Sequence, residues 1–142
     1  MLKLATDEDS KLLFKWRNLS SAIELSLLQK TVSWSEHQSW FIGARKQNSI
    51  LLFMIDGKAG YVRCDKQDND VTISIYLSPP NRSKGLGIVS LNSAMREVYN
   101  KWQIHKFVAY IKEDNEASKK LFYKCGFVKV ANEKGFHKME SL

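Results

Sequence analysis

The segment from Pro79 to Gly87 combines glycines with basic residues and reads Pro-Pro-Asn-Arg-Ser-Lys-Gly-Leu-Gly. It lies between a predicted strand and a predicted helix. Gly85 and Gly87 let the backbone approach a ligand closely, and the positive end of the following helix attracts anions. Arg82 and Lys84 add full positive charges. The segment therefore indicates a pyrophosphate site, unless it is only a strand-to-helix turn that needs two left-handed residues.

A second informative segment runs from Asn115 to Phe127 and reads Asn-Glu-Ala-Ser-Lys-Lys-Leu-Phe-Tyr-Lys-Cys-Gly-Phe. Asp114 or Asn115 can cap a short helix there, and Gly126 can end it. Together, and at this separation, the two segments resemble the signature motifs of the GNAT superfamily of acetyl-CoA-dependent N-acetyltransferases. The resemblance covers residues 50–130 well and the N-terminal third more loosely.

The resemblance implies that acetyl-CoA is the co-substrate and that its pantetheine arm lies in a gap between two splayed central strands, 70–78 and 106–111. Backbone groups near Leu77, Ser78 and Pro79 would bond the arm, while the loop amides would hold the pyrophosphate. Asn115 can also be a helix cap, and Ser118 a solvated helix residue. The implied cofactor contacts are Leu77, Ser78, Arg82, Ser83, Lys84, Gly85, Leu86, Gly87, Asn115, Ser118 and Phe122.

Acetyl transfer by direct attack needs a neutral amine beside the thioester and a hydrogen-bond donor for the carbonyl oxygen, on which negative charge develops. The backbone N–H of Leu77 or Ser78 is the expected donor. Direct attack requires no covalent intermediate with the protein. We therefore expect Cys64 and Cys125 to be reduced and buried as small apolar side chains.

The leaving thiolate is protonated in many members of the family by a tyrosine four residues before the motif glycine. Phe122 stands at that position here, with Tyr123 beside it. Adjacent helix residues point about 100° apart, so Tyr123 is a candidate catalytic acid that can equally be a surface or core tyrosine. Tyr76, Tyr110 or a water are alternatives, and a thiolate with a pKa of about 8.5 can also leave without an acid.

A third pattern joins Trp16-Arg17-Asn18 to the segment Ser33 to Phe41, which reads Ser-Trp-Ser-Glu-His-Gln-Ser-Trp-Phe. It resembles a bacterial GNAT subgroup that acetylates the amine of nucleotide-linked amino sugars for surface glycans. The resemblance implies a catalytic base at His37, which titrates near neutrality, and acceptor contacts at Arg17, Asn18, Trp34, His37 and Trp40. The alternative places Trp16, Trp40 and Phe41 in the core, His37 on the surface and Arg17 as a helix C-terminal charge.

Hydrophobic periodicity predicts the elements that position these motifs. Helices are expected from Thr6 or Asp7 to near Asn18, over 35–46, and after Gly87, where residues 88, 91, 95, 98 and 102 share one face. The short apolar runs predict strands, and strict alternation places Val71, Ile73, Ile75 and Leu77 on one face. Asp56-Gly57 is expected to be a hairpin turn. Ser33 or Ser35 can cap the second helix, with Glu36 as the capping-box partner of Ser33. We expect an α/β (α+β) fold of the GNAT type, with a mixed, mostly antiparallel sheet of about seven strands and helices on both faces. The predicted strands are Leu2–Leu4, Ile50–Ile55, Ala59–Cys64, Val71–Leu77, Phe107–Ile111, Phe127–Val130 and Phe136–Met139.

Composition limits the possible classes of protein. The 142 residues suit a single domain over 1–142, and a hydrophobic content of 44% excludes a chain that is disordered throughout. The longest apolar run, Ile50–Ile55, is far shorter than the about 20 residues of a membrane span. The polar run that begins at Thr6 leaves no room for a secretory signal, so we expect a cytoplasmic protein.

The net charge of +7 favours a phosphate-bearing small molecule, because the basic residues are dispersed along the chain. The expected reaction moves acetyl from acetyl-CoA to the primary amine of a nucleotide-linked amino-deoxy sugar. A protein N-terminus is the alternative acceptor, a polyamine or aminoglycoside stays possible, and a basic nucleic-acid-binding domain is the distant alternative. We expect no nucleic acid partner, no metal at Asp65, Asp68 and Asp70, and a monomer or homodimer.

Overall fold

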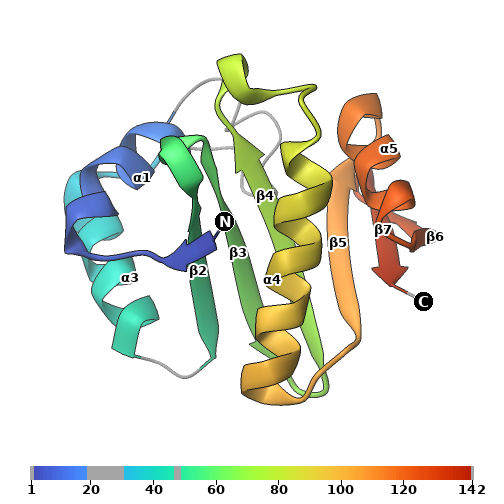
Figure 1. Ribbon diagram of the computed structural model, residues 1–142, viewed down its shortest axis with the longest axis horizontal. Helices are drawn as coiled ribbons and strands as arrows, with labels where there is room; N and C mark the ends of the chain where they lie inside the picture. Colours follow the sequence, from blue (N-terminus) through green and yellow to red (C-terminus); the bar gives the residue numbers. More distant parts are fainter. Residues whose placement is uncertain (1, 19–30, 47–48, 142) are drawn as a thin grey trace.

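The computed structural model describes residues 2–18, 31–46 and 49–141 (Figure 1). Seven strands form one sheet in the order β1-β2-β3-β4-β5-β7-β6, and neighbouring strands are antiparallel except for β4 and β5. This mixed sheet confirms the predicted fold class. The strands are β1 Leu2–Leu4, β2 Ile50–Ile55, β3 Gly60–Gln67, β4 Asp70–Leu77, β5 Phe107–Lys112, β6 Phe127–Glu133 and β7 Phe136–Ser141.

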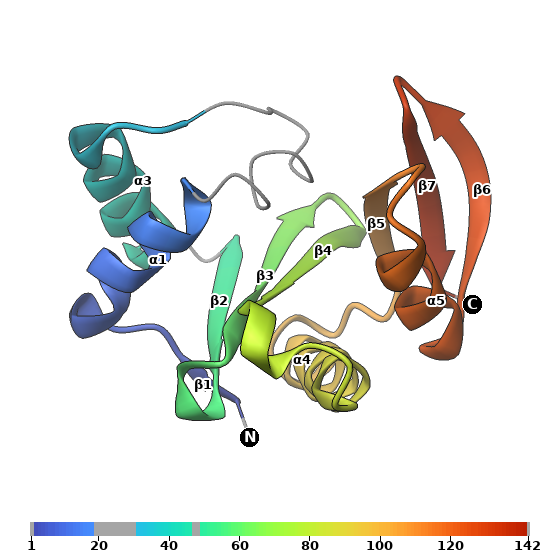
Figure 2. The same cartoon turned by 90° about the horizontal axis from the view of Figure 1, so that it is seen from above.

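Helices cover both faces of the sheet. Figure 2 shows α1 (Ser10–Arg17) and α3 (Trp34–Lys46) on one side, and α4 (Leu86–Trp102) and α5 (Glu116–Lys124) on the other. None of the helices in the described part of the chain is long and apolar enough to cross a membrane.

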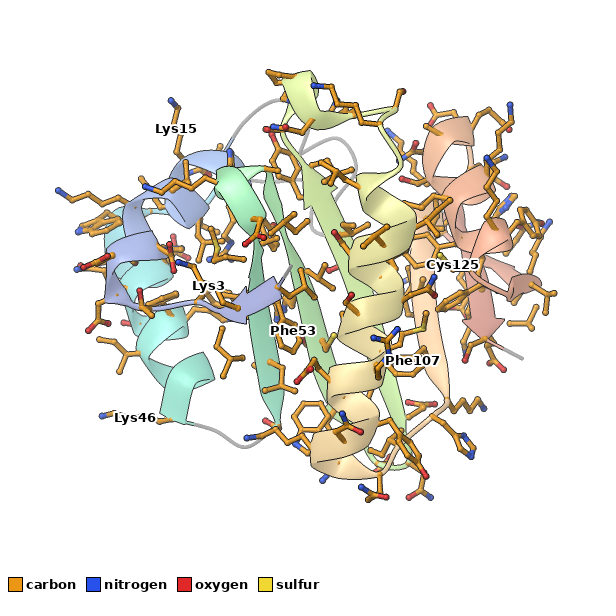
Figure 3. All side chains as sticks on the ribbon, in the orientation of Figure 1. Lys3, Lys15, Lys46, Phe53, Phe107 and Cys125 are labelled. Carbon is orange, nitrogen blue, oxygen red and sulfur yellow. The ribbon has the colours of Figure 1, made fainter. Side chains whose placement is uncertain are left out.

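The larger core lies between the sheet and α4. Val71 and Ile73 of β4 are buried in it, and Ile75 and Leu77 pack against it, which confirms the period-two prediction for this strand. Figure 3 labels two further members, Phe53 of β2 and Phe107 of β5. From the helices it receives Leu91, Ala94, Val98 and Phe122.

A smaller core holds α1 and α3 on the opposite face, through Leu13, Trp16, Phe41, Leu52, Met54 and Tyr76. The predicted capping box forms at the start of α3. Ser33 N–H donates to Glu36 Oε1 at 2.9 Å, and Glu36 N–H donates to Ser33 Oγ at 3.2 Å. Before α1, Asp9 Oδ2 accepts the Thr6 N–H at 2.8 Å, so a short 3-10 turn over Asp7–Asp9 precedes the helix.

The connections differ from the expectations in two places. The predicted Asp56-Gly57 hairpin turn is a three-residue 3-10 turn over Asp56–Lys58, so β3 begins at Gly60. Both β3 and β4 extend to a tight turn at Asp68-Asn69, where Asp68 has a φ of 54°. The residues of β3 and β4 next to this turn are polar, so the apolar pattern placed the end of β3 and the start of β4 too far from the turn.

Gly60 fixes the contact between β3 and the end of β4. A Cβ on this residue would overlap the backbone oxygen of Tyr76 and come within 2.9 Å of Leu77 Cα. These are backbone atoms, so no side-chain rotation relieves the clash.

We predict that Gly60→Ala lowers the free energy of unfolding by about 1–3 kcal/mol, the usual range for overpacking. Thermal unfolding measures the loss. The matched control is Gly43→Ala in α3, where a Cβ meets nothing within 4 Å and alanine favours the helix. Equal melting temperatures for the two variants would contradict the close approach at Gly60.

Candidate active site

The gap between β4 and β5 begins where their pairing stops. The strands pair only at Val71 with Phe107 and at Thr72 with Val108. Beyond these residues their ribbons diverge toward the top of Figure 1. The predicted splay is thereby confirmed, and the C-terminal half of β4 has no paired strand on its β5 side.

Alternation along β4 decides which backbone groups face the gap. Ser78 N–H donates to Ala59 O at 2.8 Å, on the β3 side. Successive residues of a strand direct their N–H and C=O groups to alternate sides, so those of Leu77 point toward β5. The N–H of Val71 shares this direction and donates to Lys106 O at 3.0 Å. The Leu77 N–H is therefore the amide at the mouth of the gap.

Ser78 supplies no second amide there, which corrects the expectation for this residue. Its N–H and its hydroxyl both donate to Ala59 O, at 2.8 and 3.1 Å. The following residue, Pro79, has no N–H. Leu77 O accepts a hydrogen bond from Arg82 Nε at 2.8 Å. Of the backbone groups that were expected to bond the ligand, the Leu77 N–H is therefore the one that still faces the gap.

The loop before α4 presents backbone amides to solvent. Ser83 and Gly85 have left-handed conformations, with φ of 61° and 80°, and Gly85 is the N-cap of α4. The first N–H groups of a helix lack partners within it and carry the positive end of its dipole. Ser83, Lys84 and Gly85 are exposed, so these amides and the Lys84 ammonium are accessible to an anion.

Three residues of the predicted loop site also make contacts within the protein. The Arg82 guanidinium bonds Leu77 O, with its carbon 5.7 Å from the centre of the Tyr76 ring. Leu86 is half-buried against the main core. Gly87 is buried, and a Cβ there would come within 2.9 Å of a Leu121 methyl carbon. The small size of Gly87 therefore serves the packing of α4 on α5.

The start of α5 joins Asn115 to Ser118. Asn115 Oδ1 accepts the Ser118 N–H at 3.2 Å, and Asn115 Nδ2 donates to Ser118 Oγ at 3.0 Å, so the cap prediction is confirmed. Phe122, expected at the cofactor, is only 3% exposed and packs edge-to-face on Phe127 with ring centres 5.0 Å apart. Phe122 is a core residue, whereas Tyr123 is 50% exposed.

His37 lies between α1 and α3 and is completely buried. Its Nε2 is 2.8 Å from Ser10 O, and its Nδ1 is 3.0 Å from Arg17 Nη1. A carbonyl only accepts and a guanidinium only donates, so Nε2 carries the proton and Nδ1 accepts. Burial is the main cause that lowers the pKa of His37. His37, the expected base, thus has no free lone pair that could take a proton from an amine. The alternative prediction, which placed His37 on the surface, is wrong.

Arg17 and Arg63 form a positively charged patch with Trp40. The guanidinium carbons lie 4.5 and 4.8 Å from the centre of the Trp40 ring. Arg63 bonds the Asp65 carboxylate through two hydrogen bonds of 2.8 Å. Burial lowers the pKa of Arg17, and the nearby charge of Arg63 lowers it further. We call Arg17, Arg63 and Trp40 the arginine–tryptophan patch.

Sequence reasoning missed Arg63. The available signal was the alternation of β3, in which Val62 and Cys64 are buried in the main core and Arg63 must face the other side. On that side Tyr61 stacks on Tyr76, with ring centres 5.8 Å apart. Tyr76 is 8% exposed, and its hydroxyl has no hydrogen-bond partner among the described residues.

Asn18 makes a structural contact, and its expected contact with the acceptor stays a prediction. Its Nδ2 donates to Val32 O at 2.9 Å and its Oδ1 accepts the Val32 N–H at 2.8 Å, which ties the end of α1 to the segment before α3. Trp34 is 37% exposed and stacks on His37 with ring centres 5.7 Å apart. Part of the Trp34 ring therefore remains accessible.

The cysteines do not suit nucleophilic chemistry. Cys64 is buried and Cys125 half-buried, and burial raises the pKa of both thiols. Metal chemistry has no evident site either, since no group of three or more His, Cys, Asp and Glu side chains within residues 2–18, 31–46 and 49–141 is arranged to hold an ion.

Comparison with known proteins identifies the family. The sequence matches the acetyltransferase (GNAT) domain over residues 1–128. It is 28% identical over 140 residues to an "N-acetyltransferase 9-like protein" of Nematostella vectensis, across 86% of this chain and 71% of the relative.

Two solved structures share the fold. Spermidine N-acetyltransferase from Vibrio cholerae, in complex with CoA and spermine, has a TM-score of 0.85 at 16% identity, with 99% of this chain and 93% of that chain covered. An aminoglycoside acetyltransferase in complex with coenzyme A has a TM-score of 0.79 at 20% identity, with 99% and 93% covered. The chain therefore belongs to the GNAT acetyltransferase family and is an acetyl-CoA-dependent N-acetyltransferase.

Proposed function

We propose that the acceptor is the primary amine of a nucleotide-linked amino-deoxy sugar, acetylated in the cytoplasm for surface glycan synthesis. The arginine–tryptophan patch is the observation that carries this proposal. Arg17 and Arg63 lie over one aromatic ring, on the α1 and α3 face of the sheet. A diphosphate suits guanidinium groups, and a sugar or base suits an indole ring.

The acetyl donor is proposed to lie across the gap, with its pyrophosphate on the loop before α4. The free amides after Gly85 and the Lys84 ammonium support this placement. Asn115 and Ser118 would border the pantetheine arm. Acetyl-CoA supplies the activated carbonyl. The Leu77 N–H would donate to the carbonyl oxygen as the C–N bond forms and the C–S bond breaks.

The proton leaves the amine in this reaction, and the leaving thiolate gains one. Tyr76 immediately precedes Leu77, and its buried hydroxyl lacks a hydrogen-bond partner among the described residues. We therefore favour Tyr76 as the group that hydrogen-bonds the reacting atoms. Tyr123, with half of its surface exposed on α5, is the alternative acid.

His37 is proposed to be a positioning residue. Its Nδ1 accepts a hydrogen bond from Arg17, and its Nε2 donates to Ser10 O, so the ring links the guanidinium to the backbone of α1. A neutral imidazole orients Arg17 without cancelling its charge. Trp34 and Phe41 both stack on the imidazole, with ring centres 5.7 and 5.9 Å from its centre.

We predict that acetyl-CoA raises the melting temperature, and that one of the UDP-, GDP- or dTDP-linked amino sugars releases thiol. Arg17→Gln should raise the KM of that acceptor at least 10-fold with little change in kcat, because a charge-assisted contact contributes about 1.5–3 kcal/mol. The control is Lys15→Gln, an exposed cation of the same helix. Thiol release with spermidine, an aminoglycoside or a peptide N-terminus, and not with nucleotide-linked sugars, would overturn the proposed acceptor.

We predict that Gly85→Val removes most of the stabilisation by acetyl-CoA, which is about 2.7 kcal/mol at 100 times the Kd for the unchanged chain. A β-branched residue strains the left-handed φ of 80° and displaces the loop amides. The control is Gly126→Val at the end of α5, where φ is 92° and a Cβ also meets nothing within 4 Å. Equal stabilisation of both variants by acetyl-CoA would contradict the assignment of the pyrophosphate site to this loop.

We predict that His37→Gln raises the acceptor KM and leaves kcat nearly unchanged, since the residue acts through Arg17. Loss of kcat at saturating acceptor would instead restore the role of base. Because the pKa of His37 is lowered in the fold, stability should decrease as the pH falls below about 6.5, where the unfolded chain takes up the proton first. Nitrogen NMR of the ring at pH 7.5 should show a proton on Nε2 and none on Nδ1.

A further inference from the structure

We propose that a cavity near the start of β4 binds the nucleoside end of the acceptor, an inference that rests on the proposed function. The cavity has a volume of about 240 Å³ and lies between the β3–β4 turn and the strands β5 and β7. It is smaller than the usual pocket for a whole drug-sized ligand, so it suits one part of an extended acceptor.

The cavity lies on the same face of the sheet as the arginine–tryptophan patch. Val71 and Ile73 face the α4 core, so Asp70 and Thr72 face the opposite side. Ala109 and Met139 also lie in that core, which places the alternating residues Tyr110 and Lys138 beside Thr72 and Asp70. Tyr110 and Lys138 are directly paired across β5 and β7.

The path from the mouth of the gap at Leu77 to the cavity runs along β4. Ser74, paired with Arg63, is exposed and lies between the mouth of the gap and the cavity. From Leu77 to Thr72 and Asp70 there are five to seven residues, or about 17–23 Å at about 3.3 Å per residue. An amino sugar, a diphosphate and a ribose in an extended conformation can span such a distance, with the diphosphate near the arginine–tryptophan patch.

The lining suits a neutral polar ring system. The phenol ring of Tyr110 can stack on a base, and the Gln67 amide can bond a base edge with both a donor and an acceptor. Carboxylates at Asp68 and Asp70 can accept hydrogen bonds from ribose hydroxyls, as acidic residues do in dinucleotide sites. Lys138 contributes a cation on the other wall, where its Nζ lies 3.9 Å from Glu140 Oε2. Opposite charges and neutral polar groups share the wall, which does not favour a simple cation site.

The experiment is fluorine NMR of the full chain in which tyrosines carry 3-fluorotyrosine, with the Tyr110 signal assigned by Tyr110→Phe. UDP, GDP and dTDP are titrated separately, with inorganic pyrophosphate as the phosphate-only probe. We expect one nucleoside diphosphate to shift the Tyr110 signal saturably, and pyrophosphate to leave it in place. Asp70→Asn should raise the Kd of that nucleotide at least 10-fold, whereas the control Glu97→Gln, on the exposed side of α4, should not.

Two results would overturn the inference: no shift of the Tyr110 signal with any of the three nucleotides at millimolar concentration, or an equal shift with pyrophosphate alone. This readout needs no acceptor turnover, so it separates the cavity from the proposed function. If no nucleotide-linked sugar is acetylated but a nucleotide still shifts Tyr110, the acceptor proposal fails, and the cavity is a nucleotide site that does not serve the acceptor. With an acceptor that the enzyme acetylates, Asp70→Asn should raise the KM of the nucleotide-linked sugar, whereas the control Glu97→Gln should not.

Discussion

The interruption of pairing between β4 and β5 is the constraint on which the rest of the site depends. Backbone N–H and C=O groups in a sheet need partners, and those of Leu77 face a side where no strand is paired. Arg82 satisfies Leu77 O, which leaves the N–H. The contact of Ser78 with Ala59 holds the end of β4 on β3, and the absence of a side chain at Gly60 permits it. The strand is therefore anchored on one side and open on the other.

The sheet separates the two halves of the chemistry. The amides before α4 lie on one face, and their direction is fixed because Leu91 and Val98 anchor that helix in the main core. The arginine–tryptophan patch lies on the opposite face, against α1 and α3. In the proposed reaction, the thioester and the amine would approach from these two faces and meet where the strands diverge. The gap lies at the C-terminal half of β4, next to the loop that leads into α4.

Local signals predicted the elements, and tertiary packing decided the roles of several residues. Capping at Ser33 and Asn115, the alternation of β4 and the glycine loop are properties of short segments, so they could be predicted from the sequence. The burial of His37 depends on Ser10 from another helix, and the amide of Ser78 is engaged because of the β3 register. Both contacts join residues of different elements, so no pattern within a short segment predicts them. The family motif likewise assigns a role to position 122, but it does not predict that the phenylalanine found there is a core residue.

The partners of the two arginines explain how the patch keeps a charge for a ligand. Arg63 is paired with Asp65, so that pair has no net charge. Arg17 bonds a neutral imidazole, which orients the guanidinium and leaves its charge uncompensated at that contact. A half-buried guanidinium loses part of its hydration, which costs free energy. The lowered pKa of Arg17 reflects this cost, and the group stays protonated. A carboxylate at position 37 would offset part of that cost, but it would also neutralise the guanidinium charge that the proposed anionic acceptor would use.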